Sequence, residues 1–483
     1  MRRPLNWIRR WRLSVPLVVA VLMEACAGPG SSAPDAGAEA PRQGKLPSAS
    51  LPIPVDASVP AMGPDGVGMV PPDDDSPVHG SITARYISRD TDHAHDEDAY
   101  ALVEASVNDP EEDGWNAYVS GRVARDLDGG LQDTSSPFHS IDDAHGDATH
   151  THLYEAWIEG HATDFDLLRL GRQELFDTPE WVRFDGLQVE TAPQGSWKQQ
   201  FGFYGGLPAR LDSEAGGDTL WGAWLKDRPW SGGRTRLDVM HLADEERLGA
   251  ETNTLLAANV HQQFGADLAA EANYTLLDGA SRDFDLRGTF VQAASGWTAQ
   301  VNYHELLNAQ NVLAEELDPF SSALLTYEPY WQASALLGKS FEAGFDLQAG
   351  WDTRRLKDAS DAGAFNRDTE RGFLTAVVHD VLVQGCAVSL TGERWSGDGS
   401  EMNTWGADLT QDWSRDVSTS VGSYFAMYKD DLLLGLEHQD VRTWYAKFKL
   451  RTDPKLTWTA GFDHEENEVG SYDTLTVRAS WIF

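Results

Sequence analysis

The amino-acid sequence predicts an all-β protein: a closed, antiparallel transmembrane β-barrel of about 18–22 strands, with a best count of about 22. Three observations lead to this prediction. The chain begins with an export leader, continues as a long series of segments in which apolar and polar residues alternate, and ends on such a segment with Phe483. Because a strand has a side-chain period of two residues, each segment has one apolar and one polar face.

Residues 1–26 are expected to be a signal peptide and to stand outside the fold. A basic stretch, residues 2–12, precedes a short apolar run, residues 13–23. The residues before Cys26 resemble a lipobox, in which a small residue precedes an acylated cysteine, although Glu24 fits this pattern poorly. Acylation at Cys26 and ordinary cleavage near Ala25 both remain open, and either route exports the chain.

Residues 27–79 are rich in Pro, Ala, Gly, Ser and Asp and are expected to form a disordered linker, because this composition cannot bury a core. The linker is too short and too polar for the folded plug domain of an active transporter. The barrel is therefore expected over residues 80–483.

The overall charge limits the partners that can be expected. The formal net charge is −38, and binding to nucleic acid requires a basic face, so nucleic acid is not expected as a partner. No apolar stretch after the leader is long enough for a membrane helix. The two cysteines, Cys26 and Cys386, predict no disulfide framework, and Cys386 is expected to be a small packed or lipid-facing residue.

The alternation is strictest in residues 297–304, 345–352, 444–451, 456–463 and 475–483, where the apolar faces begin or end with Trp, Tyr or Phe. Aromatic residues at strand ends are typical of a membrane-interface girdle. A soluble sandwich or propeller would instead use them to fill a core. The predicted strand cores are 81–89, 98–107, 115–127, 153–160, 165–174, 183–191, 196–204, 218–226, 233–242, 253–263, 266–277, 282–292, 296–305, 330–340, 343–353, 368–378, 384–394, 402–412, 416–428, 439–451, 455–464 and 472–483.

The connections between these strands sort by parity. Those after odd strands tend to be long (128–152, 205–217, 306–329, 354–367 and 429–438), and those after even strands tend to be short. Outer-membrane barrels have long outer loops and tight periplasmic turns, whereas a sandwich has no reason for such sorting. The short connection at 278–281 departs from the pattern and points to a possible miscounted strand. The loops 128–152 and 306–329 are the candidates for narrowing the passage.

One patch of the sequence is specific enough to suggest a family. Residues 153–192 contain LYEAWIEG, LLRLGRQEL and WVRFDGLQVE in succession. A Gly-Arg-Gln strand, a short loop with a tryptophan and a Phe-Asp-Gly strand resemble the alginate export family of outer-membrane β-barrels. The resemblance implies a monomeric channel that passes an anionic polysaccharide or another polar solute. Family members usually have about eighteen strands, fewer than the count made here, and the acidic linker is a further departure.

Within this patch, Gly171 is expected to allow a close approach of neighbouring groups on a curved wall. Either Arg169 or Arg172, depending on register, is expected to point into the lumen, because a charge that faces lipid is costly. Asp185 is placed to pair with one of them. Whether such a pair only braces the wall or contacts a solute stays open.

Parity predicts which charged residues line the lumen. The predicted bases include Arg85, Arg122, Lys198, Arg234, Arg236, Arg287, Lys447, Lys449, Arg451 and Arg478, and the predicted acids include Glu104, Glu155, Glu159, Glu190, Asp238, Glu271, Asp285, Asp346, Glu393 and Asp408. Lys447, Lys449 and Arg451 share one face of one strand and could attract an anion. The alternative is that facing carboxylates neutralise them.

Two acidic segments, 90–98 and 142–152, contain histidines, and His145, His150 and His152 are weak candidates for binding a divalent cation. Their spacing matches no defined metal site, and a surface that meets lipopolysaccharide through bridging cations is the simpler interpretation. The sequence contains no Gly-x-Ser-x-Gly elbow, no His-Glu-x-x-His and no Walker loop, so no enzyme activity and no cofactor are expected.

These observations predict a porin-like channel of the bacterial outer membrane that acts as a monomer among lipid and lipopolysaccharide. Passage of polar or anionic solutes would be passive, and polysaccharide export is the specific function that the resemblance implies. Two alternatives remain: a barrel that serves as a scaffold for a secreted or surface partner, and a soluble exported β protein that binds carbohydrate.

Overall fold

The computed structural model describes residues 78–107, 114–128, 148–162, 164–209, 218–244, 251–308, 328–362, 366–381, 383–397, 399–431 and 436–483. The strands are β1 Val78–Asp90, β2 His95–Val107, β3 Trp115–Asp126, β4 Thr149–Ala162, β5 Phe165–Leu175, β6 Val182–Thr191, β7 Gln200–Pro208, β8 Thr219–Asp227, β9 Gly233–Asp244, β10 Glu251–Phe264, β11 Leu268–Leu277, β12 Ala280–Gln292, β13 Trp297–Leu306, β14 Tyr330–Phe341, β15 Phe345–Leu356, β16 Thr369–His379, β17 Cys386–Gly397, β18 Ser400–Ser414, β19 Val417–Asp431, β20 Leu436–Asp453, β21 Leu456–Glu466 and β22 Ser471–Ile482.

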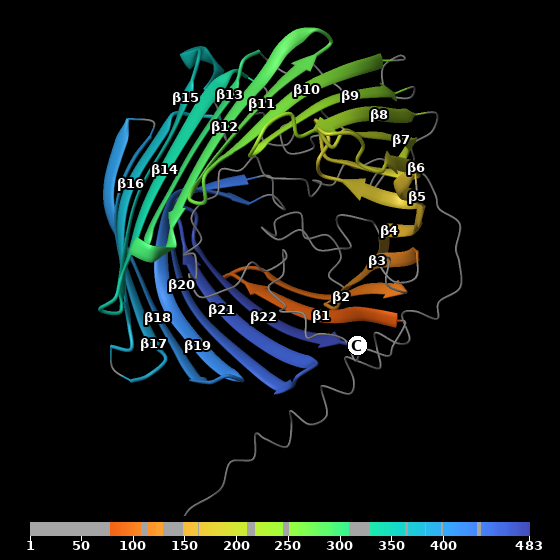
Figure 1. Ribbon diagram of the computed structural model, residues 1–483. Helices are drawn as coiled ribbons and strands as arrows, with labels where there is room; N and C mark the ends of the chain where they lie inside the picture. The colour runs from red at the N-terminus through yellow and green to blue at the C-terminus, as the bar shows by residue number, and fades with distance from the viewer. Residues whose placement is uncertain are drawn as a thin grey trace, which may run out of the picture.

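These strands form one closed antiparallel barrel. Each strand pairs with its neighbours in the chain, and β1 also pairs with β22 from Ser81↔Ile482 to Asp90↔Asp473. Figure 1 shows the resulting ring of tilted strands around a central space. The predicted fold class and the best count of 22 strands are confirmed.

Helical structure is minor. Two 3₁₀ turns, η1 Ala293–Ser295 and η2 Ala359–Asp361, lie between strands. Asp358 caps η2, and hydrogen bonds from the hydroxyl and amide of Ser360 hold the pKa of Asp358 below its ordinary value. Within the described residues, no helix has the length and hydropathy that a membrane crossing needs.

The apolar rows of the strands face outward and are not covered by a second sheet. Leu170 is 65% exposed, Ile158 60% and Leu374 57%. Two stacked sheets would bury such rows against each other, so the sandwich alternative is wrong. We call the rim where β1 begins and β22 ends the terminal rim, and the opposite one the loop rim. Exposed aromatic residues at strand ends follow the terminal rim: Trp115, Phe165, Phe201, Trp297, Phe341, Trp413 and Trp481.

The last residue takes part in closing the barrel. The backbone amides of Gly80 and Phe483 each donate to the other residue's carbonyl, at 3.1 and 3.0 Å. A Cβ at Gly80 would lie 2.6 Å from the Phe483 ring, so glycine provides the space for the terminal aromatic side chain.

The connections follow the predicted parity, with two corrections. The longest connection at the terminal rim is 192–199. The connections 127–148 and 307–329, at the loop rim, are longer. The short connection after β11 is a tight turn in which Asp278 and Gly279 both have positive φ, as in a type I′ turn, so no strand is missing there. The predicted long loop 429–438 is wrong, because β19 runs to Asp431 and β20 starts at Leu436.

Two hairpins leave the wall near the loop rim and bend into the interior. Figure 1 shows a yellow arrow of β5 and a blue arrow of the β19–β20 hairpin inside the ring. The β4–β5 ladder ends at Ala156↔Arg172 although both strands continue, and the β18–β19 ladder likewise ends at Ala407↔Ser423. The wall therefore forks beside each hairpin. The predicted constricting segments, 128–152 and 306–329, lie largely outside the described residues.

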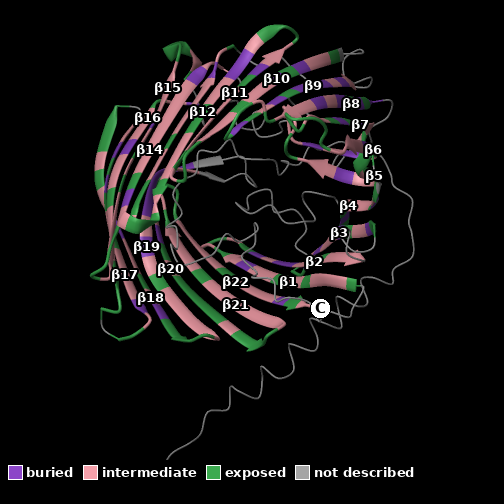
Figure 2. Cartoon of the chain, viewed as in Figure 1, coloured by how far each residue is buried: buried purple, intermediate pink, exposed green. Residues whose placement is uncertain are grey.

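Both buried apolar clusters of the described residues lie at these hairpins. One contains Val182, Phe184, Tyr204, Leu220, Trp224, Met240, Leu242 and Leu255, and the other Trp395, Phe425 and Met427. Phe425 has the same parity in β19 as the exposed Val421, yet it packs against Trp395 on the interior face of β17. Figure 2 shows that most of the remaining barrel is only partly buried. The two buried apolar clusters of the described residues therefore hold the two hairpins inside the barrel.

Three glycines mark the line along which the β5–β6 hairpin bends. Gly171, Gly186 and Gly206 lie side by side in register across β5, β6 and β7. Gly171 has φ +132°, and a Cβ there would lie 2.2 Å from the carbonyl oxygen of Ala156. The close approach predicted for Gly171 is confirmed, and no larger residue fits this position.

Candidate functional site: the barrel interior

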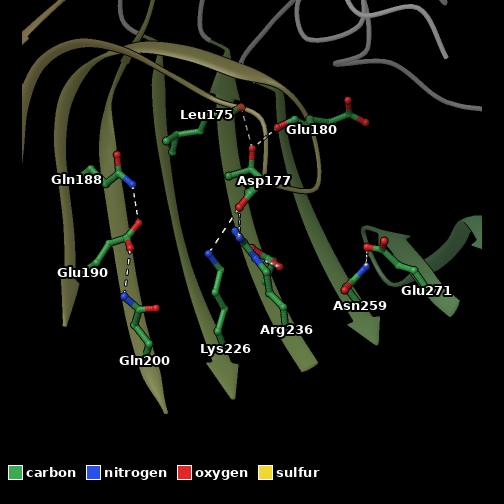
Figure 3. A network of polar contacts seen from close by, with 12 residues as sticks. Leu175, Asp177, Glu180, Gln188, Glu190, Gln200, Lys226, Arg236, Asn259 and Glu271 are labelled. Atoms are coloured by element: carbon green, nitrogen blue, oxygen red, sulfur yellow. Dashed lines mark hydrogen bonds and ion pairs between the residues drawn. The ribbon is translucent and has the colours of Figure 1, made fainter. Parts of the chain in front are cut away.

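The carboxylates that line the interior are held by neighbouring side chains. Glu104 accepts a hydrogen bond from Ser81, Glu155 from Trp157, Glu159 from Arg169, Glu190 from Gln188, Asp238 from Arg236, Glu271 from Asn259, Glu393 from Arg371 and Asp408 from Thr410, while Asp285 and Asp346 contact His304 and His379. Figure 3 shows the pairs of Glu190 with Gln188 and of Asn259 with Glu271. All ten predicted interior acids therefore have a described partner.

Several interior bases differ from these acids in having no such partner. Lys447, Lys449 and Arg451 follow one another on the interior face of β20, are exposed, and form no ion pair with a described residue. Lys447 Nζ lies 4.9 Å from the centroid of the Tyr445 ring. We call these three residues the basic ladder. Asp463 on the neighbouring strand β21 interacts electrostatically with Lys447, so a facing carboxylate compensates this end of the ladder, whereas Lys449 and Arg451 form no ion pair with a described residue.

Arg234 and Arg287 are also exposed on the interior face and form no ion pair with a described residue. Arg478 lies in register beside Arg85 on β1, and its Nε donates to the Ser480 hydroxyl at 3.2 Å. Arg234 and Arg287 thus add two exposed positive charges to the interior face of the described wall.

The other predicted arginines are engaged by the protein. The Arg122 guanidinium lies 5.8 Å from the centroid of the Tyr100 ring and 5.9 Å from that of Tyr154. Arg236 is buried, and its Nε and Nη2 donate to the carboxylate of Asp238. These two arginines are parts of the wall rather than open charges.

The structure assigns the two arginines of the Gly-Arg-Gln patch to opposite faces of β5. Arg169 shares its face with buried Gln173, pairs with Glu159, and stacks on the Trp157 ring at 4.0 Å. Arg172 lies on the other face, and its Nη2 is 2.7 Å from the carboxylate of Asp185. The sequence predicts that Asp185 pairs with either Arg169 or Arg172, and it pairs with Arg172. Arg172 and Asp185 therefore lie on the face of the hairpin opposite to Arg169, and their place in the lumen stays a prediction.

Arginines also cover the backbone at both forks. Arg172 Nη1 donates to the carbonyl of Leu153 at 3.2 Å, above the end of the β4–β5 ladder. Arg442 Nη1 donates to the carbonyl of Trp405 and its Nη2 to the Thr404 hydroxyl at 2.6 Å, above the end of the β18–β19 ladder. At each fork the neighbouring strand has moved away, and the guanidinium donates a hydrogen bond to a backbone carbonyl there.

The connection 176–181 at the tip of the β5–β6 hairpin lies against the interior wall. Asp177 contacts Lys226 Nζ at 3.6 Å and Arg236 Nη1 at 3.3 Å, and Glu180 pairs with Arg282. Figure 3 shows Asp177 pointing toward both bases. The sequence analysis missed this contact, since alternation carries no information about which wall a bent hairpin meets.

The two histidine candidates that the structure describes, His150 and His152, do not form a metal centre with other described residues. His150 and His152 lie in β4 with ring centroids 6.3 Å apart, and His152 Nε2 is 3.4 Å from the guanidinium of Arg183, which disfavours a nearby metal cation. Among the described residues, no group of three or more His, Cys, Asp or Glu is placed to hold a metal ion. His145 and Cys26 lie outside the described residues, and Cys386 is buried without a disulfide.

Comparison with known proteins gives similarity of architecture. The chain is similar to the P pilus usher (PapC) translocation pore (10% identity, TM-score 0.46, covering 84% of this chain and 99% of that chain). It is also similar to the outer membrane protein opdK of Pseudomonas aeruginosa (9%, 0.42, 84% and 98%) and to OccK9 (OpdG) of Pseudomonas aeruginosa (13%, 0.42, 84% and 98%). No protein-family model and no curated protein matches the chain. At these identities the likeness concerns the fold alone.

Proposed function

We propose that this protein is a channel of the bacterial outer membrane through which polar and anionic solutes pass passively. The observation that carries the proposal is the basic ladder, because its three charges are exposed inside a closed barrel whose ten predicted interior acids each have a described partner. Positive charge on the wall of a low-dielectric passage concentrates anions there.

The exterior supports the membrane part of the proposal. The outward rows are apolar, they are exposed, and aromatic residues follow the terminal rim, as expected of strands that cross a bilayer. We infer that lipid and lipopolysaccharide surround a single barrel and that the chain acts without a cofactor and without catalysis.

An acidic polysaccharide is the more specific solute that we propose. It rests on the resemblance of residues 153–192 to the alginate export family and on the row of bases, since a uronate chain presents carboxylates at regular spacing. The inward hairpins would then narrow the passage from the loop rim.

Conductance in planar bilayers tests the channel. The purified protein should give discrete current steps, and featureless traces from well-folded barrels would favour a scaffold whose lumen is filled by a partner.

Selectivity tests the basic ladder. The triple variant Lys447→Gln, Lys449→Gln, Arg451→Gln should lower the anion-to-cation permeability ratio by a few-fold, on the order expected for removing exposed wall charges. Arg394→Gln is a suitable control, because this arginine is largely exposed and lies on β17, which does not pair with β20. A ratio that is unchanged in the triple variant would mean that these bases do not set selectivity.

A further inference from the structure

The tip of the β5–β6 hairpin places an acid on a prepared basic site. Lys226 Nζ lies 4.3 Å and the Arg236 guanidinium 5.1 Å from the centroid of the Trp224 ring. The Trp224 ring is 5% exposed and holds the two bases next to each other, where one carboxylate can contact both.

Asp177 is one of three carboxylates that face the two bases, and it is the only one of the three supplied by the hairpin tip. Asp238 binds Arg236 through both carboxylate oxygens, at 2.9 and 2.8 Å from Nε. Glu190 on β6 interacts electrostatically with Lys226 and Arg236. Asp177 lies 3.6 Å from Lys226 Nζ and 3.3 Å from Arg236 Nη1, so a carboxylate that arrives from the interior can contact both bases at once.

The two acids at the tip are held to different degrees. The side chain of Asp177 is 79% exposed, whereas that of Glu180 is 17% exposed and pairs with Arg282, which is 9% exposed. Exposed ion pairs contribute little free energy, and buried pairs are costly to break. Asp177 can therefore leave its partners while Glu180 keeps the hairpin at the wall.

We propose that Lys226 and Arg236, held in place by Trp224, form a carboxylate-binding site for the passing solute, and that Asp177 occupies this site as an internal substitute when no solute is bound. This inference rests on the proposed function and assigns the site within it. An acidic sugar competes with Asp177 for the two bases, whereas a neutral sugar of the same size does not.

Competition predicts opposite effects for the two partners. Asp177→Asn removes the competitor and should tighten binding of trigalacturonate by roughly two- to fivefold, the range given by one exposed ion pair. Lys226→Gln removes a ligand of the carboxylate and should weaken binding by a similar factor. The affinity for maltotriose, the neutral probe, should be the same in both variants and in the wild-type protein.

Titration calorimetry on the protein in detergent measures both affinities and does not require conduction. Blockage of single-channel current by trigalacturonate should give the same order. Glu401→Gln is the matched control, because Glu401 is also an exposed acid in an ion pair, 67% exposed and bound to Arg394. It should leave trigalacturonate binding unchanged.

Trigalacturonate affinity that is unchanged or lower in Asp177→Asn would overturn the inference. Absence of conductance with the predicted order of affinities would overturn the proposed channel but leave the binding site standing. Equal effects on trigalacturonate and maltotriose would show that the variants alter the hairpin rather than a carboxylate site, and would also count against it.

Discussion

Single residues decide where the wall can bend. Gly171 combines a positive φ with backbone contacts that leave no room for a Cβ, while Gly461 on β21 has nothing within 4 Å of the same atom. Both are strand glycines, so the difference between them isolates the effect of the bend. The Gly-Arg-Gln patch therefore carries conformational information as well as charge.

Gly171→Ala should destabilise the folded barrel by about 1–3 kcal/mol, from an unfavourable backbone conformation alone, and by more if the Ala156 carbonyl cannot move. Urea unfolding in detergent micelles, followed by the heat-dependent shift in gel mobility, measures the change. Gly461→Ala is the control and should unfold at the wild-type urea concentration. Equal midpoints for the two variants would contradict the role assigned to Gly171.

At the scale of elements, two hairpins make the same excursion. Each separates from the strand before it, each has an arginine covering a carbonyl at the fork, and each packs its outward-parity face onto the interior of neighbouring strands. In β6 that face carries Arg183, which contacts His152, and in β19 it carries Phe425, which packs edge-on against Trp395 with centroids 6.4 Å apart. The inward position is therefore held by specific contacts.

Phe425→Ala should release the β19–β20 hairpin, because truncating a packed phenylalanine costs about 3–5 kcal/mol. The expected result is a larger and noisier single-channel conductance than that of the wild-type protein. Val421→Ala changes the same strand on the exposed outer face and should leave conductance unchanged. A Phe425→Ala channel with wild-type traces would show that this hairpin does not limit the passage.

For the whole molecule, the decisive property is that one face of a closed sheet meets hydrocarbon and the other meets water. Leu374 and Thr375 are adjacent at the middle of β16 and point to opposite faces. Leu374 is 57% exposed on the outside, and the Thr375 hydroxyl lies 2.8 Å from that of Thr391 on the interior face. Substitutions at these two positions therefore test, within one strand, which face of the barrel contacts lipid.

Leu374→Arg should lose about 2–4 kcal/mol of stability in a bilayer, since an arginine at the midplane of the lipid face is costly. Thr375→Arg places the same side chain in the hydrated interior and should be tolerated. The folded fraction after refolding into lipid vesicles measures both. Equal yields would mean that the outward rows do not contact hydrocarbon.

The sequence by itself determined the closed barrel, its 22 strands, the outward rows and the parity of the connections. It could do so because strand alternation is local, with a period of two residues that needs no knowledge of neighbours. It also grouped Lys447, Lys449 and Arg451 in one strand with one parity, as β20 has them.

Only the tertiary structure decided which hairpins leave the wall and what they meet. Parity alone would place Phe425 and Arg183 in lipid, yet contacts with Trp395 and His152, distant in the chain, bring them inside. Alternation alone puts Arg169 and Arg172 on opposite faces of β5, but only the register with the neighbouring strands gives their partners, Glu159 and Asp185. Alternation determines on which face of its own strand a residue lies. Bending of a hairpin moves both faces of the strand relative to the barrel. The contacts that stabilise the bend come from residues that are far away in sequence.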